Sequence, residues 1–311
     1  MCSCLTGFGQ TDTLQFKADV FAETYFWRGQ SSGKSPIFYN HTTGNQAALN
    51  LGILALTWQR KNWTLQTDFM TGTYSQRNLA AEPGMLKNLY QANLSYQINS
   101  RHTLVAGILP SHIGLESAKN WDNPSFSRSY IAENSPYYES GISWNFMPKP
   151  HITLRLLALT GWQHISRFRP AVGAQFTYDT KGLRVNSSSF LGNEGKGMRM
   201  FFSNYLTVPL ADTWQWTLCS DWGLESNAAW HGGAMFIAWQ PNKKIHLAGR
   251  LEYYSDKQAR IMSDAFTDKA ASINLDYHLL TGIQFRSEWK RSQTFGNEWM
   301  VGILTNLQLK K

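Results

Sequence analysis

The sequence contains little cysteine and no long apolar run. Only three of its 311 residues are cysteines, and Cys2 and Cys4 both lie close to the N-terminus. Cys219 is therefore alone in the body of the chain, so we expect neither a disulfide framework nor a metal site built on cysteine. No apolar run reaches the roughly 18 residues that a transmembrane helix requires.

Sequence motifs for catalysis are also missing. There is no Gly-x-Ser-x-Gly, no His-Glu-x-x-His and no glycine loop of the kind that holds phosphate. Several histidines could pair with a serine elsewhere in the chain, but no spacing brings them together. We therefore predict a protein that is not an enzyme and has no cofactor or metal. The histidines are His102, His151, His164, His231, His246 and His278.

Charge is sparse and spread along the chain. Charged residues make up 16% of the sequence, with 29 Lys and Arg against 21 Asp and Glu, a net charge of +8. No block of basic residues occurs, which argues against nucleic acid as a partner. A basic balance remains compatible with anionic lipid or with a pore that attracts anions.

Aromatic residues and glycine are plentiful. Aromatics reach 14% of the chain, which has 13 Trp and 24 Gly, and the mean hydropathy is −0.36. A transmembrane β-barrel combines these features, because apolar side chains that face lipid alternate with polar side chains that face the lumen.

Alternation with a period of two runs through nearly the whole chain. In the first run Phe16 and Val20 share one face and Lys17 and Asp19 the other. Most runs are as long as the roughly 9–11 residues with which a tilted strand crosses a bilayer. The predicted strands are 15–29, 45–59, 62–75, 87–99, 102–114, 137–146, 151–163, 171–179, 183–192, 198–208, 213–224, 229–239, 245–255, 271–277, 283–291 and 298–309.

Short turns alternate with generally longer gaps between these runs. QRKN, NSRH, MPKPH, DTKG, PLAD, QPNKK and HLLTG are the short connections. This arrangement is typical of an antiparallel transmembrane barrel with short periplasmic turns and longer extracellular loops, and an even strand number closes the sheet without an edge. The alternative all-β folds, a propeller or a soluble sandwich, do not predict regular alternation of turn lengths.

Aromatic residues near the predicted strand ends fit the belts that barrels place at the two membrane interfaces. The alternative is that they belong to a soluble core. They are Trp58, Trp63, Trp144, Trp162, Tyr178, Trp239, Tyr277, Trp289 and Trp299.

The longest segment without alternation is 115–136, between two strand-like runs. A loop of this length in a compact domain usually has a function. We interpret it as a loop that folds into the lumen, where Arg128 would hold it against a wall carboxylate; a solvated surface loop is the alternative. Its predicted constriction residues are Glu116, Lys119, Asp122, Arg128 and Glu133.

Charged residues on the polar strand faces are predicted to line the lumen. Those near the C-terminus could form a ladder across neighbouring strands, which either braces the wall or makes the pore selective. The lumen-lining set is Lys17, Asp19, Glu23, Asp68, Glu139, Arg155, Arg184, Arg199, Asp221, Arg250, Glu252, Asp276, Arg286, Glu288 and Lys290.

The N-terminus differs from the rest of the chain. Residues 1–10, MCSCLTGFGQ, look like the end of a secretory signal peptide, with a short disordered terminus as the alternative. Residues 11–311 then form one barrel domain.

One stretch carries a family resemblance. IGLESAKNWDN, SRS and PYYESGISW, from Ile113 to Trp144, together with INLDYHLLTGIQFRSEW near the end, resemble the OmpL-like β-barrel porin (porin-2) family of Gram-negative outer membranes. Gly114-Leu115-Glu116, Pro136 and Gly141 are its most specific elements. The resemblance implies a porin-like channel in the outer membrane. The chain ends in LQLKK rather than in the terminal aromatic common to such barrels.

Two functions follow from these expectations. The first is passive diffusion of small hydrophilic or ionic solutes, because about sixteen strands leave an aqueous channel. The second is a structural, receptor or assembly-partner barrel with a blocked lumen. Outer-membrane lipid is the expected partner in both cases, and the sequence leaves a homo-oligomer open.

Overall fold

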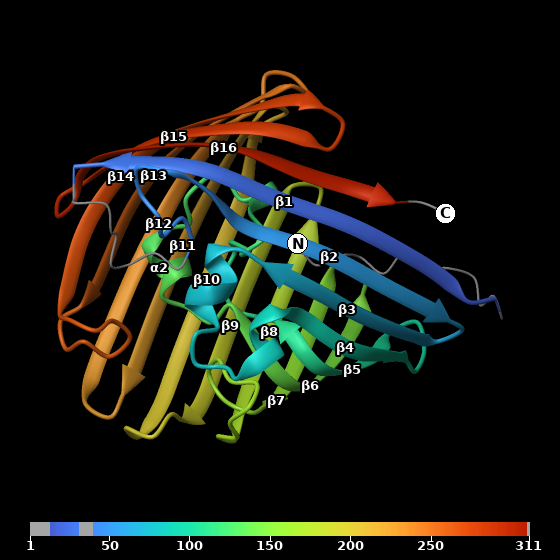
Figure 1. Ribbon diagram of the computed structural model, residues 1–311. Helices are drawn as coiled ribbons and strands as arrows, with labels where there is room; N and C mark the ends of the chain where they lie inside the picture. The colour runs from blue at the N-terminus through green and yellow to red at the C-terminus, as the bar shows by residue number, and fades with distance from the viewer. Residues whose placement is uncertain (1–12, 31–39, 310–311) are drawn as a thin grey trace.

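The chain folds into a closed ring of strands. In the computed structural model, which describes residues 13–30 and 40–309, sixteen strands form one antiparallel barrel (Figure 1). This confirms the predicted fold class and strand number. The strands are β1 (Gln15–Gly29), β2 (Ala47–Arg60), β3 (Trp63–Thr71), β4 (Leu89–Gln97), β5 (His102–Pro110), β6 (Tyr138–Lys149), β7 (Ile152–Leu159), β8 (Ala171–Thr180), β9 (Leu183–Asn193), β10 (Met198–Ala211), β11 (Trp214–Glu225), β12 (Ala228–Trp239), β13 (Ile245–Asp256), β14 (Phe266–Leu280), β15 (Ile283–Ser292) and β16 (Gly296–Leu309).

Each strand pairs with its neighbour in sequence, and β1 pairs with β16 to close the ring. The closing register runs from Ala18 opposite Leu309 to Gly29 opposite Glu298. Closure satisfies the backbone groups that an open edge would expose, which is the condition for β structure in lipid. The beginning of β1 and the end of β16 lie on the rim that carries the short turns.

Several predicted strand ends are wrong for local reasons. The run 62–75 ends as a strand at Thr71, because Gly72 takes a φ of 123° and the helix α1 (Thr73–Asn78) follows. A Cβ at Gly72 would collide with the Asn50 carbonyl. The run 102–114 ends at Pro110, which has no N–H for further pairing.

Two further boundaries differ. The strand predicted at 271–277 already begins at Phe266, since Phe266 to Ala270 pair with Asp256 to Glu252 of β13. The strand predicted at 151–163 ends at Leu159, and Trp162 beyond it packs against buried residues inside the ring. The predicted signal remnant, residues 1–10, lies outside the described residues.

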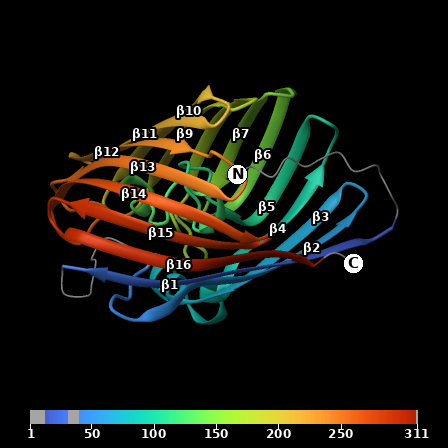
Figure 2. The same ribbon diagram turned by 90° about the horizontal axis from the view of Figure 1, so that it is seen from above.

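Short helical segments occur in two of the connections opposite the short turns. They are α1, η1 (Gly84–Asn88), η2 (Asn120–Asp122) and α2 (Tyr130–Glu133). Among the described residues no helix is long and apolar enough to cross a membrane. The helices η2 and α2 belong to the segment between β5 and β6, which Figures 1 and 2 show within the ring of strands.

Large apolar side chains lie mainly on the outside of the barrel. Leu65, Ile142, Leu156, Leu218 and Ile273 are all exposed on outward strand positions. A water-soluble protein would bury such residues, whereas a transmembrane barrel presents them to lipid. The packed core is inside the ring, where inward side chains meet the segment between β5 and β6.

Candidate functional site: the loop inside the barrel

The segment between β5 and β6, residues 111–137, is the inner loop. It leaves the wall after Pro110, crosses the interior and returns at Tyr138. Phe126 and Tyr130 are fully buried at its centre. Phe126 lies over Gly302 of β16 and Ile131 over Gly232 of β12, and a Cβ at either glycine would collide with these side chains.

Two wall arginines bind the backbone of the inner loop. The Arg286 guanidinium of β15 donates to the carbonyls of Asn120 at 2.6 Å and Asn123 at 2.9 Å. Arg250 of β13 donates to the carbonyl of Ser127 at 2.6 Å and to its hydroxyl at 2.8 Å. Charge-assisted hydrogen bonds of this kind are about twice as strong as neutral ones, so the loop is held in a defined position.

Carboxylates of the same wall accept hydrogen bonds from the loop. The Ser127 N–H donates to Glu288 at 2.5 Å and the Tyr130 N–H donates to Glu252 at 2.6 Å. The Tyr130 hydroxyl donates to Asp268 at 2.7 Å. Buried backbone donors need such partners in place of water, and the wall supplies them.

The charges of β13, β14 and β15 also pair with one another and form the ladder that the sequence suggested. Arg250 lies 3.0 Å from Glu288 and 3.3 Å from Glu252, while Lys290 lies 2.8 Å from Glu252. Arg286 lies 2.6 Å from Asp276. We call the strands β13 to β16 the anchoring wall. Arg250, Glu252, Asp276, Arg286, Glu288 and Lys290 on β13 to β15 pair with one another or bind the inner loop.

Arg128 does not take the place that the sequence suggested. It was expected to hold the loop against a wall carboxylate, but its guanidinium donates to the carbonyl of Glu116 at 3.1 Å and stacks 4.0 Å from the Tyr137 ring. All three residues belong to the inner loop. The cations that hold the loop to the wall are the wall residues Arg250 and Arg286. Arg128 stabilises the fold of the loop itself.

The other predicted constriction residues differ in their surroundings. Glu116 is buried and accepts hydrogen bonds from the N–H and hydroxyl of Ser129, and burial raises the pKa of its carboxyl. Glu133 is buried and accepts from Asn40 at 3.2 Å. Lys119 donates to Asn306 at 3.0 Å, and burial lowers its pKa. Asp122 is exposed.

The remaining predicted lumen charges lie elsewhere on the inner face. Some of them are paired: Lys17 with Asp19 at 2.7 Å, Arg199 with Glu225 at 3.0 Å, Asp68 with Gln91 at 2.5 Å and Glu139 with His112 at 2.8 Å. Glu23 holds His41, Asp221 is buried, and Arg155 and Arg184 line a cavity.

Two loop histidines that the sequence did not single out connect loops to the wall. His112, at the start of the inner loop, bonds Glu139 through Nδ1 and the Ser189 carbonyl through Nε2 at 2.9 Å. His41 bonds Glu23 and packs 4.8 Å from the Phe126 ring. For His112 a signal existed, since it lies two residues after Pro110, the proline that ends β5.

The predicted polar inner face is wrong for the loop-side half of β9 to β12. Phe190, Phe201 and Trp230 point inward there and belong to one buried cluster with Ile131 of the inner loop. Trp162, predicted to lie at the membrane interface, is also inside: its ring lies 5.0 Å from Phe190. Burial against the inner loop favours apolar side chains at these positions over water-facing ones.

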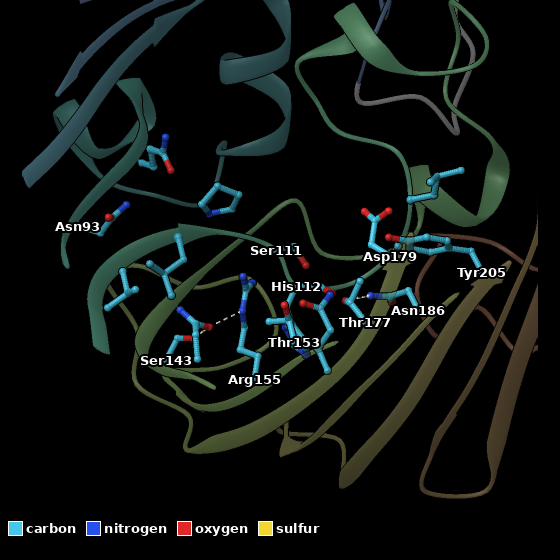
Figure 3. A pocket seen from close by; sticks show the side chains of 18 of the residues that line it. Asn93, Ser111, His112, Ser143, Thr153, Arg155, Thr177, Asp179, Asn186 and Tyr205 are labelled. Atoms are coloured by element: carbon cyan, nitrogen blue, oxygen red, sulfur yellow. Dashed lines mark hydrogen bonds between the residues drawn. The ribbon is translucent and has the colours of Figure 1, made fainter. Parts of the chain in front are cut away.

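A polar cavity lies between the inner loop and the short-turn rim. This turn-side cavity has a volume of about 290 Å³ and is lined by β3 to β10, which we call the cavity wall. Arg155, Thr153, Thr177 and Asn186 project into it (Figure 3). Most of its polar groups are amides and hydroxyls, and its Asp179 is paired with Arg184 at 2.7 Å.

A smaller cavity lies on the other side of the inner loop. It has a volume of about 170 Å³, and its lining includes Asn78, Trp162, Arg199 and Arg260. The start of the inner loop lines the turn-side cavity and its end, from Glu133, lines this loop-side cavity. The loop therefore separates the two spaces.

Comparison with solved structures shows the same fold. The outer-membrane channel DcaP of Acinetobacter baumannii superposes with a TM-score of 0.61 at 11% identity, over 95% of this chain and 97% of that one. A variant of the Rh. blastica porin gives a TM-score of 0.59 at 11% identity, over 95% of this chain and 100% of that one.

Sequence comparison gives a family. Among curated proteins, no sequence matches the chain significantly. The family described as "Putative beta-barrel porin-2, OmpL-like" matches residues 18–301, which confirms the resemblance seen in the sequence. With its sixteen-stranded closed barrel, the chain belongs to this porin family and is an outer-membrane β-barrel of the porin type.

Proposed function

We propose that the protein is a channel for passive diffusion of small hydrophilic or ionic solutes, with the inner loop as its constriction. The observation that carries this proposal is the division of the barrel interior. One side of the loop is fastened to the anchoring wall by Arg250 and Arg286, while the opposite wall faces a polar cavity. Solutes would pass along the cavity wall, where amides and hydroxyls replace part of their hydration.

Selectivity would then depend on the charges that still face solvent. On the anchoring wall Arg250 and Lys290 are already paired with carboxylates. Arg155 lines the turn-side cavity and is only half-buried. We therefore propose Arg155, and not the buried Arg128, as the cation that favours anions along the path.

A blocked barrel is the second candidate, and the packing of the loop favours it. Tyr130 and Phe126 sit in two apolar clusters on either side of the loop, with Trp230 and Phe236 in one and Tyr25 and Leu304 in the other. Such packing resembles a protein core more than a flexible gate. In that case the barrel would be a receptor, a structural protein or an assembly partner.

Conductance in planar bilayers separates the two candidates. If the loop constricts an open channel, the parent protein conducts, and a variant with residues 119–131 replaced by a short glycine linker conducts more. If the barrel is blocked, the parent protein gives no current steps, and only the shortened variant conducts. Equal conductance of both proteins would contradict the role of the loop. Arg167→Glu, an exposed change on the rim, is the control for altered surface charge.

A further inference from the structure

The outer surface of the barrel carries a groove that the channel does not explain. It has a volume of about 610 Å³ and lies across β13 to β16 next to the end of β1. Leu251 and Ala271 form part of its apolar lining, and Lys269 and Arg291 bring two positive charges. We call this surface the outer-wall groove.

Both cations point away from the barrel interior. Along β14, Lys269 is exposed while its neighbour Asp268 is buried, and along β15 Arg291 is exposed while Lys290 is buried. In the described part of the chain, neither side chain makes an ion pair or hydrogen bond. Arg291 lies opposite Ala271 in the register, which places it diagonally to Lys269, and such diagonal neighbours are about 7–8 Å apart at Cα.

The side chains next to the groove indicate its position relative to the membrane. Directly below Lys269 on the same face come Ala271 and Ile273, the latter 62% exposed. Directly below Arg291 comes Trp289. Tryptophan and tyrosine mark the interface of a barrel with the headgroups, so the two cations lie at the level where lipid headgroups begin. They are on the rim opposite the short turns.

The end of β1 lies beside the groove and carries a further cation. Arg28 is exposed and lies opposite Trp299 in the register. Next to it, the side-chain carbonyl of Gln30 accepts from the Asn297 N–H at 3.2 Å, and both residues line the groove. Arg28 and Trp299 therefore lie on the strands beside the groove, at the same end of the barrel.

We propose that the outer-wall groove binds the phosphorylated headgroup of an outer-leaflet lipid. Arginine binds phosphate through two parallel N–H donors and lysine through a compact charge. Leu251, which is 55% exposed, and Ile273 offer the surface that acyl chains cover. Because the two cations stand directly above a surface that faces acyl chains, a phosphate attached to such chains fits the groove, and the occupant is a lipid. The proposal holds for an open and for a blocked barrel.

The test measures lipid binding to the protein purified in neutral detergent. Bisphosphorylated lipid A is titrated and the bound fraction is read by native mass spectrometry, with dephosphorylated lipid A as the second probe. The variant Lys269→Gln/Arg291→Gln removes both charges at similar length. We expect its affinity for the phosphorylated lipid to fall at least about tenfold, since it loses two charge-assisted contacts.

Matched controls distinguish a site from general attraction. Lys243→Gln/Lys244→Gln removes two exposed cations from the opposite rim of the same barrel and should leave affinity unchanged. Lys269→Arg/Arg291→Lys should retain binding, and heat-modifiable migration shows that each variant is folded. Equal binding by the parent and the Gln variant, equal binding of dephosphorylated lipid, or displacement by inorganic phosphate alone would each overturn the proposal.

Discussion

The two halves of the barrel interior use their polar residues in different ways. On the anchoring wall, Arg250, Arg286 and Lys290 are all fully or almost fully buried and bonded to carboxylates or to the inner loop. On the cavity wall, Arg155 and Thr153 are only half-buried and face open space.

This difference links charge to packing. Charges that hold a loop must be desolvated, and desolvated charges are stable only when each has partners. They are then poorly placed to act on a passing solute. Neutral amides and hydroxyls lose less hydration free energy than charged groups when a solute replaces their water. The cavity wall is therefore the surface that suits transport. The comparison predicts that mutations on the first wall change stability and mutations on the second change selectivity.

The largest expected effect is on stability at the anchoring wall. Arg250→Met should lower the free energy of unfolding by about 3–5 kcal/mol, because it leaves buried Glu288 without its cation while Glu252 keeps only Lys290. The matched change Arg155→Met should cost less than about 1 kcal/mol, since that side chain is partly solvated. Urea unfolding of both variants in detergent measures the difference. Similar losses would mean that the two walls are built alike.

The next effect concerns selectivity at the cavity wall. Thr153→Asp places a carboxylate beside Arg155 in the turn-side cavity. An added charge at contact distance in water is worth roughly 1 kcal/mol, so the cation-to-anion permeability ratio should rise by a factor of about five. The reversal potential in a salt gradient measures it.

The control for this change is Gln258→Asp, which adds the same charge at an exposed position after β13. Its reversal potential should equal that of the parent. If Thr153→Asp also leaves the reversal potential unchanged, the path of the solute does not follow the cavity wall.

Much of this fold could be predicted from the sequence, but the partners inside the barrel could not. Alternation sorts residues such as Glu252, Arg286 and Glu288 onto the inward face whatever they later contact. It also indicates that 115–136 is not a strand. It does not indicate which wall the loop contacts, because that depends on Gly232 and Gly302, which offer room beneath Ile131 and Phe126. Inward Phe201 and Trp230 were missed because their burial depends on a loop distant in sequence.

The smallest effect is the pH dependence of two loop carboxyls. Burial raises the pKa of Glu116 in the inner loop above its ordinary value of 4.5. For Glu194, beyond β9, burial acts in the same direction, but hydrogen bonds from His164 and the Trp162 N–H outweigh it and lower the pKa. A carboxyl with a raised folded-state pKa contributes stability at low pH that is lost as the pH rises through that value, and a lowered pKa has the opposite sign.

The difference in unfolding free energy between the parent and each variant, Glu116→Gln or Glu194→Gln, should therefore change with pH in opposite directions. Relative to Glu116→Gln, the parent should lose unfolding free energy as the pH rises from 4.5 through the folded-state pKa of Glu116. Relative to Glu194→Gln, it should lose unfolding free energy as the pH falls below 4.5. Unfolding free energies measured for the three proteins across a pH series test both signs at once. If the stability of the parent relative to Glu116→Gln does not fall as the pH rises, Glu116 is not desolvated in the folded protein and water reaches its part of the inner loop.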